Sequence, residues 1–169
     1  MAVTQQLARL SADQLAVCRR ATEELDRLCS YRLLPAADHL DLDWSPAALC
    51  RAAELGPAAP ATVAALRRAL DGDAEINPAY RDRAEAVWEH PVTALEPAGV
   101  AEVAARLAAA DPEVVPAAVT AEPALAAARL GLPAVDGDPR RHLRGHLVAL
   151  REFYQAAARR GLAVAAWWD

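Results

Sequence analysis

The sequence contains no lysine, and all 18 of its basic residues are arginine, which we interpret as a compositional bias of GC-rich coding. Acidic residues number 23, so the formal net charge is −5. Because phosphate backbones and anionic lipids repel an acidic chain, we expect binding neither to nucleic acid nor to a membrane surface. A protein partner or self-association is left open.

Glycine and serine are also scarce. None of the seven glycines belongs to a G-x-G-x-x-G or P-loop pattern, which excludes nucleotide binding by those routes. The serines are Ser11, Ser30 and Ser45; two of them occupy predicted helix-capping positions, and none lies in a G-x-S-x-G motif. Nucleophilic catalysis therefore has little support. We expect no cofactor, and the question of enzymatic activity is left open.

The three cysteines lack the C-x-x-C spacing of redox and zinc motifs. Cys18 and Cys29 fall on one predicted helix, about 16 Å apart at 1.5 Å per residue, which is too far for a disulfide. We expect these two and Cys50 to be reduced thiols that behave as small core residues.

Long apolar runs are missing, so no membrane span is predicted. The first residues, MAVTQQLARLSADQ, do not place a basic segment before an apolar one, and we expect no secretory signal. A soluble protein of the cytoplasm is therefore predicted. Its 169 residues are close to the commonest size of one domain, so we expect a single domain over 1–169.

Hydrophobic periodicity predicts a helix-rich fold with a small sheet. Strands are expected at 3–10, 86–95 and 162–168. The last is fully apolar, so we expect it to be central in the sheet. Pro91 places the second strand at an edge or a bulge. Helices are expected at 11–29, 45–56, 62–70, 96–107, 111–130 and 139–160. The predicted class is α+β, a mostly antiparallel sheet of about three strands covered by five or six helices.

Three motifs carry a family resemblance. A helix–glycine–strand ending reads L-x-x-F-Y-x-x-A-A-x-x-G-x-A-V over 150–164, L-D-L-D-W stands at 40–44, and V-T-A-L-E-P at 92–97 leads from a strand into a helix. In order and spacing these motifs resemble the YfbM-like family of bacterial proteins, catalogued as a domain of unknown function. The resemblance covers nearly the whole chain. It implies the family's fold and a cytoplasmic location, and it leaves activity open.

The chain departs from the family at one place. After L-D-[LI]-D the family commonly continues with a tryptophan and a run like L-H-x-L-L-T-G. Here Trp44 follows Asp43 directly, and SPAALCRAAE replaces the rest. Any role of the histidine in that run cannot be carried over to this chain.

Asp41 and Asp43, with His39, would share one face if their segment is extended. Paired carboxylates can perform general acid–base chemistry when one of them has a raised pKa. They can equally be structural groups that accept backbone N–H bonds near a helix start.

A second candidate group is aromatic. If the strand at 86–95 lies beside the last strand, Trp88 and His90 could line one face with a terminal tryptophan, Trp167 or Trp168, and form a ligand pocket. Such aromatic side chains more often fill a core or cover a sheet edge.

Metal sites were weighed at two places. His142 and His146 are four residues apart on a predicted helix, with Asp138 as a conceivable third ligand, but no Glu stands between them as in H-E-x-x-H. The acidic stretch 71–82 imitates a calcium loop but has Ile76 where that loop needs glycine. We therefore expect no metal site. Arg140, Arg141 and Arg144, at a helix start, are candidates for a small-anion or acidic-partner site.

Two functional hypotheses follow from these residues. The first is a non-catalytic binding or interaction protein, because no recognisable catalytic set is present. The second is a small-molecule-binding protein or small enzyme with a tryptophan-lined pocket. The candidate ligand-binding residues are Asp41, Asp43, Trp44, Trp88 and His90.

Overall fold

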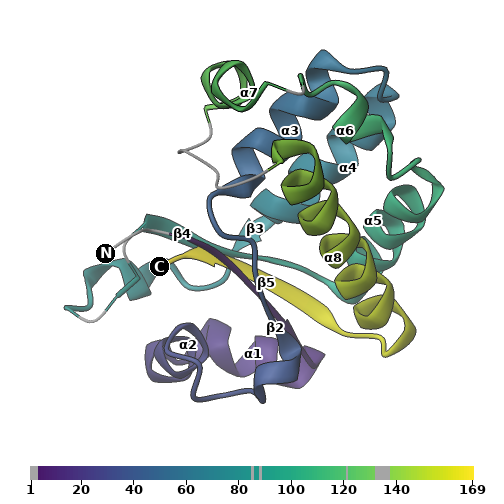
Figure 1. The fold of residues 1–169 in the computed structure, drawn as a ribbon. Helices are drawn as coiled ribbons and strands as arrows, with labels where there is room; N and C mark the ends of the chain where they lie inside the picture. Colours follow the sequence, from purple (N-terminus) through teal and green to yellow (C-terminus); the bar gives the residue numbers. More distant parts are fainter. Residues whose placement is uncertain (1–3, 85, 88, 121, 132–137) are drawn as a thin grey trace.

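The structure, a computed structural model, describes the chain except for residues 1–3, 85, 88, 121 and 132–137 (Figure 1). Its centre is one antiparallel sheet with the strand order β2-β1-β5-β4-β3. The strands are β1 (Gln5–Leu10), β2 (His39–Asp41), β3 (Ala74–Glu75), β4 (Glu89–Leu95) and β5 (Ala163–Trp168).

The sheet corrects the prediction of about three strands, because five are present. The two additional strands, β2 and β3, have three and two residues, which is too short for an alternating pattern to be recognised. The apolar strand β5 is central, as predicted, and β4 lies directly beside it. The register between β4 and β5 shifts between Glu89 and Thr93, a bulge that spans Pro91.

Helices make up most of the remaining structure. The α-helices are α1 (Ala12–Arg20), α2 (Thr22–Cys29), α3 (Ser45–Leu55), α4 (Pro60–Asp71), α5 (Pro97–Ala109), α6 (Val114–Ala117), α7 (Pro123–Leu130) and α8 (Pro139–Arg159). Two short 3₁₀ turns are η1 (Ala36–Asp38) and η2 (Pro78–Asp82). The α+β, helix-rich prediction is confirmed, but the described residues form more α-helices than the five or six expected.

Two predicted helix boundaries are wrong. The expected helix 11–29 is two helices, because Ala21 adopts an extended conformation between α1 and α2. Ser11 does form the predicted capping box with Gln14. Ser45, by contrast, is not the N-cap of its helix: Trp44 holds that position, and Ser45 lies in the first turn of α3.

The sheet separates two hydrophobic clusters. Helices α1 and α2 cover one face, and α3, α4, α5 and α8 cover the other (Figure 1). Alternation along the strands sorts the side chains: Leu7 and Val164 face the larger cluster, whereas Ala8 and Trp167 face the smaller one. Among the described residues, no helix has both the length and the apolar character that crossing a membrane requires.

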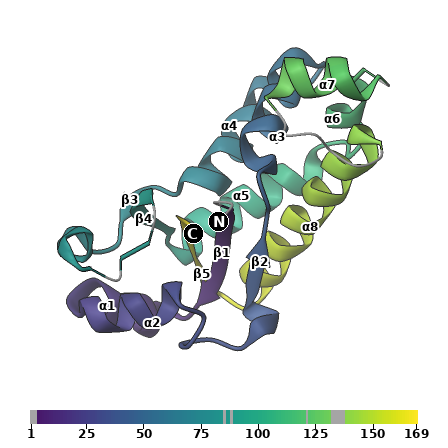
Figure 2. The ribbon, with the colours of Figure 1, turned by 60° about the vertical axis from the view of Figure 1, so that its left-hand side comes forward.

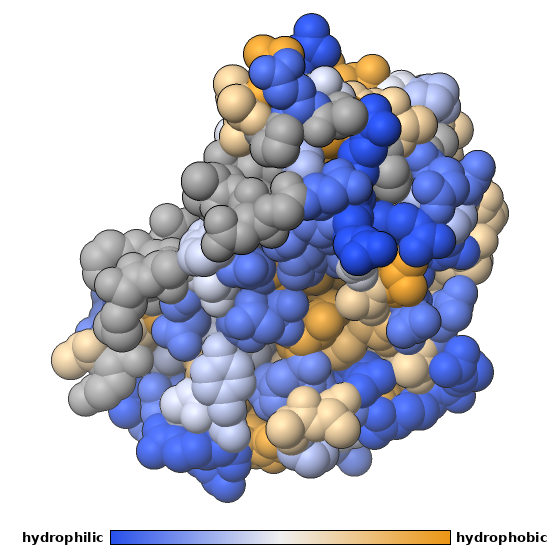
Figure 3. All heavy atoms as spheres, viewed as in Figure 1, coloured by the Kyte–Doolittle hydropathy of each residue, from blue (hydrophilic) through white to orange (hydrophobic). Residues whose placement is uncertain are grey.

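The exposed large hydrophobic side chains are distributed over separate elements: Val17, Tyr31, Trp44, Leu55 and Leu125. On the face drawn in Figure 3, hydrophobic residues are interspersed among hydrophilic ones. This pattern is ordinary for a protein surface, where scattered apolar residues need no partner.

The long helix α8 is held in place by contacts with α4 and with η1. The Tyr154 hydroxyl, fully buried, donates a hydrogen bond of 2.7 Å to the carbonyl of Ala69 in α4. At its C-terminal end Arg160 pairs with Asp38 of η1, which also pairs with Arg9 of β1. The segment from η1 through β2 therefore lies along α8, as Figure 2 shows.

Candidate functional site

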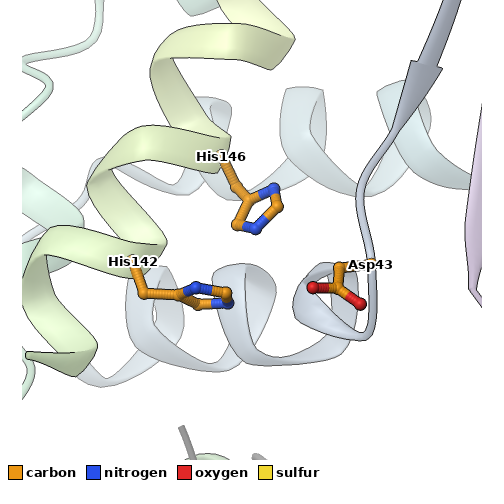
Figure 4. Close-up of side chains that lie close together, drawn as sticks. All are labelled: Asp43, His142 and His146. Carbon is orange, nitrogen blue, oxygen red and sulfur yellow. The ribbon is translucent and has the colours of Figure 1, made fainter. Parts of the chain in front are cut away.

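Asp43 occupies an unusual backbone position directly after β2. Its φ is 57°, in the left-handed region that Asp and Asn tolerate better than most residues. The Asp41 carboxylate accepts the Asp43 N–H at 2.7 Å, and the Asp43 carbonyl accepts the Gln5 N–H at 3.1 Å. These two bonds hold the turn, which directs the Asp43 side chain toward α8 (Figure 4).

His142 and His146 lie one turn apart near the N-terminal end of α8, on the flank of its buried stripe. Their ring centroids are 4.6 Å apart, and the ring planes are inclined to each other by 69°. The Ser45 hydroxyl, buried in the first turn of α3, is 2.8 Å from Nε2 of His142. A neutral imidazole has one N–H donor and one acceptor nitrogen, so this contact leaves Nδ1 of His142 free for a further partner.

The three side chains converge. One ligand atom from each of Asp43, His142 and His146 lies within 4.8 Å of the other two, and all three residues are half-buried (Figure 4). Among the residues that the structure describes, the Asp43 carboxylate and the His146 ring make no hydrogen bond or ion pair. The group therefore has donor atoms close together whose bonding capacity the protein leaves unused.

Burial and the neighbouring His142 lower the pKa of His146 below its usual 6.5, and burial is the larger effect. The charges of Asp43 and Asp41 act in the opposite direction and offset part of the change. His146 is therefore neutral at neutral pH, the form in which an imidazole nitrogen can bind a metal ion.

The predicted ligand-binding residues lie in different parts of the structure, and only Asp43 belongs to the cluster. Asp43 belongs to the cluster, and exposed Asp41 supports it through the bond to the Asp43 N–H. Trp44 is 44% exposed. Trp88 lies outside the described residues, and the structure describes the backbone of His90 in β4 but not its side chain. Whether those two side chains bind a ligand stays a prediction.

The expectation that His39 shares a face with Asp43 is wrong. Strand β2 ends at Asp41, and the positive φ at Asp43 turns its side chain toward α8. The His39 ring packs instead between Tyr31 and Trp167, with centroids 5.2 Å and 6.2 Å away, on the α1–α2 side of the sheet. His39 therefore does not belong to the group of side chains around Asp43.

Several of the other charged candidates have protein partners. In the acidic stretch 71–82, Asp73 is bound by Arg68 and Glu75 by Arg81. The stretch is divided among the end of α4, β3 and η2, so its carboxylates do not form one continuous calcium loop.

The arginine group at the start of α8 lines a cavity of about 650 Å³. Arg144 pairs there with Glu113, and Arg140 donates to the carbonyl of Val119 at 2.6 Å. Two of the three arginines are therefore already engaged by the protein.

The tryptophan-lined pocket was expected only if the strand at 86–95 lies beside the last strand. Strand β4 does pair with β5, and Glu89 lies opposite Trp168. A cavity of about 260 Å³ opens at this end of the sheet and includes Trp167 and Trp168 in its lining.

The sequence did not predict that Asp43 lies close to His142 and His146. The spacing of His142 and His146 is a recognised signal, and Asp43 was a candidate for other reasons. Nothing in the sequence pattern joins them, because they are about a hundred positions apart and meet only through the path of β2 along α8.

Comparison with known proteins shows the fold. No known protein family and no curated protein matches the sequence. Among solved structures, the chain is similar to YfbM from Escherichia coli, described as a protein of unknown function, with a TM-score of 0.60 and 14% identity. The similarity covers 96% of this chain and 98% of that one. The YfbM-like fold predicted from the sequence motifs is therefore confirmed, and an identity this low carries no function with it.

Proposed function

We propose that this protein binds a divalent transition-metal ion through Asp43, His142 and His146. The observation that carries the proposal is the convergence of the three side chains within 4.8 Å, with the Asp43 carboxylate and the His146 imidazole making no hydrogen bond or ion pair among the described residues. A binding role agrees with the first hypothesis from the sequence. The metal departs from the sequence-based expectation of none.

The donor types select the class of ion. Imidazole nitrogen suits zinc, copper, iron and nickel, whereas calcium and magnesium prefer shells of oxygen ligands. A tetrahedral ion with bonds of about 2.0–2.2 Å needs donor atoms roughly 3.3 Å apart. The three donors lie within 4.8 Å of one another, so metal binding would draw them closer by side-chain rotation.

The surroundings hold the ligands in place. Ser45 fixes the ring of His142, and Asp41 fixes the turn that presents Asp43. Groups that orient metal ligands in this way raise affinity, because less side-chain freedom is lost on binding. Both histidines lie on a helix of 21 residues whose buried stripe anchors it to the core.

Three protein ligands leave a fourth position for water or a small molecule. A site of this composition gives the bound ion room to act as a Lewis acid or to hold an anionic ligand. The function that we propose is metal binding with one open position.

Isothermal titration calorimetry with Zn²⁺, Ni²⁺ and Mg²⁺ tests the proposal. We expect one Zn²⁺ and one Ni²⁺ per chain and no saturable binding of Mg²⁺. Asp43→Asn and His146→Ala should each weaken Zn²⁺ binding at least a hundredfold, because each removes one of three ligands. Asp82→Asn is the matched control: it removes an exposed carboxylate of η2 and should bind Zn²⁺ as the native chain does.

Two results would contradict the proposal. One is Zn²⁺ binding of equal strength in Asp43→Asn and Asp82→Asn, which would place the ion elsewhere. The other is the absence of saturable binding by folded native protein to either Zn²⁺ or Ni²⁺.

A further inference from the structure

His39 lies at the start of the edge strand β2, in contact with two aromatic side chains. Its ring centroid is 5.2 Å from that of Tyr31 and 6.2 Å from that of Trp167, and the Tyr31 and Trp167 centroids are 6.0 Å apart. Trp167 is 1% exposed, whereas Tyr31 is 43% exposed. Tyr31 therefore covers the other two rings on the side that faces solvent.

The surroundings of the His39 ring suit its neutral form. Nδ1 and Nε2 are both buried, and neither makes a hydrogen bond within the described part of the chain. The Asp38 carboxylate acts on the ring, but it is already paired with Arg9 and Arg160. A protonated imidazole carries two N–H donors and a charge, and burying them without partners is costly.

This cost has a direction in pH. Burial lowers the pKa of His39 below its usual 6.5, and the charge of Asp38 and the backbone of Leu34 offset part of the change. An imidazole in contact with water has the usual value, so an open arrangement takes up a proton at a higher pH than the closed one. The closed arrangement therefore loses stability as the pH falls from about 6.5 through the folded-state pKa.

Tyr31 is held in a conformation that its side chain disfavours. Its φ is 60°, in the left-handed region where glycine is usual at the end of a helix. The Tyr31 N–H donates to the carbonyl of Leu28 at 3.1 Å, and the Arg32 N–H donates to the carbonyl of Arg27 at 2.8 Å. A bulky residue keeps such a backbone only while its surroundings enforce it, and the ring of His39 is part of those surroundings.

On the other side of His39, η1 is anchored independently of the rings. The hydrogen bond from Arg160 lowers the pKa of Asp38 below 3.8, so this carboxylate keeps its charge in mild acid. The Asp38 N–H also donates to the carbonyl of Pro35 at 2.9 Å. Mild acid therefore weakens the contact of His39 with Tyr31 and leaves the contact of η1 with α8 in place.

Other charged groups lie near Tyr31. The charges of Asp169 and Asp41 act on its hydroxyl, and Arg32 pairs with Asp26 of α2 at the protein surface. Exposed ion pairs of this kind add little stability. Variants of His39 separate the protonation of its ring from any effect of these groups.

We propose that His39 is a mild-acid switch for the turn at 30–32. When the ring gains a proton, this turn opens and Tyr31 moves away from His39, while η1 stays anchored to α8. The switch shares no residue with the Asp43 cluster, so the inference does not depend on the proposed metal.

Amide hydrogen exchange of the metal-free protein, followed by NMR at about pH 7.5 and about pH 5.5, tests the proposal. The protection factor of the Arg32 amide should be about three- to tenfold lower at the acidic pH, because one pH unit below a pKa of 6.5 favours the protonated ring about tenfold. The Asp38 amide should keep its protection factor.

Two variants of His39 and one control assign the effect. His39→Phe keeps an aromatic ring that takes up no proton, and His39→Gln is a smaller uncharged side chain in case Phe packs poorly. Both should abolish the acid-induced loss of protection at Arg32. His146→Ala is the matched control: it removes another imidazole of lowered pKa, on α8, and should leave that loss as it is in the native protein.

Three outcomes would overturn the inference. One is an Arg32 protection factor in the native protein that is equal at both pH values. Another is a loss of native size in a folded His39 variant. The third is an equal loss at the Arg32 and Asp38 amides, which would indicate general acid unfolding in place of a local opening.

Discussion

At the scale of single residues, Ser45 shows how a small side chain can control a site from outside it. Its hydroxyl is buried and 2.8 Å from Nε2 of His142. Replacing Ser45 with Ala should weaken Zn²⁺ binding about 10- to 100-fold, the usual effect of losing a group that orients a metal ligand. Calorimetry of the folded variant measures this. Native Zn²⁺ affinity in Ser45→Ala would mean that the hydroxyl serves the fold alone.

Asp38 makes a different residue-scale prediction, about pH. The hydrogen bond from Arg160, reinforced by the charge of Arg9, lowers the pKa of this buried carboxyl below 3.8. A lowered pKa stabilises the fold above about pH 3.8, and that stability is lost as the pH falls through the folded-state value. Asp38→Asn should therefore be less stable than the native protein at neutral pH, and the difference should shrink in acid.

Urea unfolding of both proteins, at about pH 7 and again near pH 3, measures this difference. The matched control is Asp13→Asn, an exposed carboxylate in the first turn of α1. A difference between native protein and Asp38→Asn that stays constant across this range would contradict the assignment of Asp38 as an ionised partner of Arg160.

At the scale of elements, glycines with positive φ follow α4, α7 and α8, and two of these glycines, Gly72 and Gly161, have different surroundings. Gly72 ends α4 with φ 66°, and a Cβ there would lie 2.8 Å from Oγ1 of Thr93 in β4. Gly161 follows α8 with φ 63°, and a Cβ there would meet nothing within 4 Å. Both positions strain an L-residue, but only Gly72 also requires close approach of a helix end to a strand.

Gly161→Ala should therefore cost about 1 kcal/mol of unfolding free energy, from backbone strain. Gly72→Ala should cost about 1–3 kcal/mol more, because β4 must also move. Urea unfolding of the two variants compares them directly. Equal destabilisation would show that the α4–β4 junction has more room than the structure gives it.

Some helices and strands could be predicted from the sequence, and others could not. The amphipathic stripe of α8, the capping box at Ser11 and the apolar β5 were predictable, because each is a local pattern repeated over several residues. The two- and three-residue strands were not, since they exist only by pairing with longer neighbours. The break at Ala21 was missed because both flanking helices continue the same apolar face.

At the scale of the whole molecule, the candidate site depends on one long-range arrangement. Arg160 holds Asp38 at the C-terminal end of α8, and the chain then runs along the helix until Asp43 lies beside His146. The residue types were visible in the sequence, but their meeting required the order of the strands and the direction of α8.

The most direct test of the central claim is anomalous diffraction from crystals of the native protein loaded with Zn²⁺. We predict a strong peak about 2.0–2.2 Å from one nitrogen each of His142 and His146 and from an Asp43 oxygen, with a fourth position filled by water or a small ligand. Two results would contradict metal binding by Asp43, His142 and His146. One is a zinc ion bound at other residues, and the other is the absence of an ion at this cluster in crystals soaked with zinc.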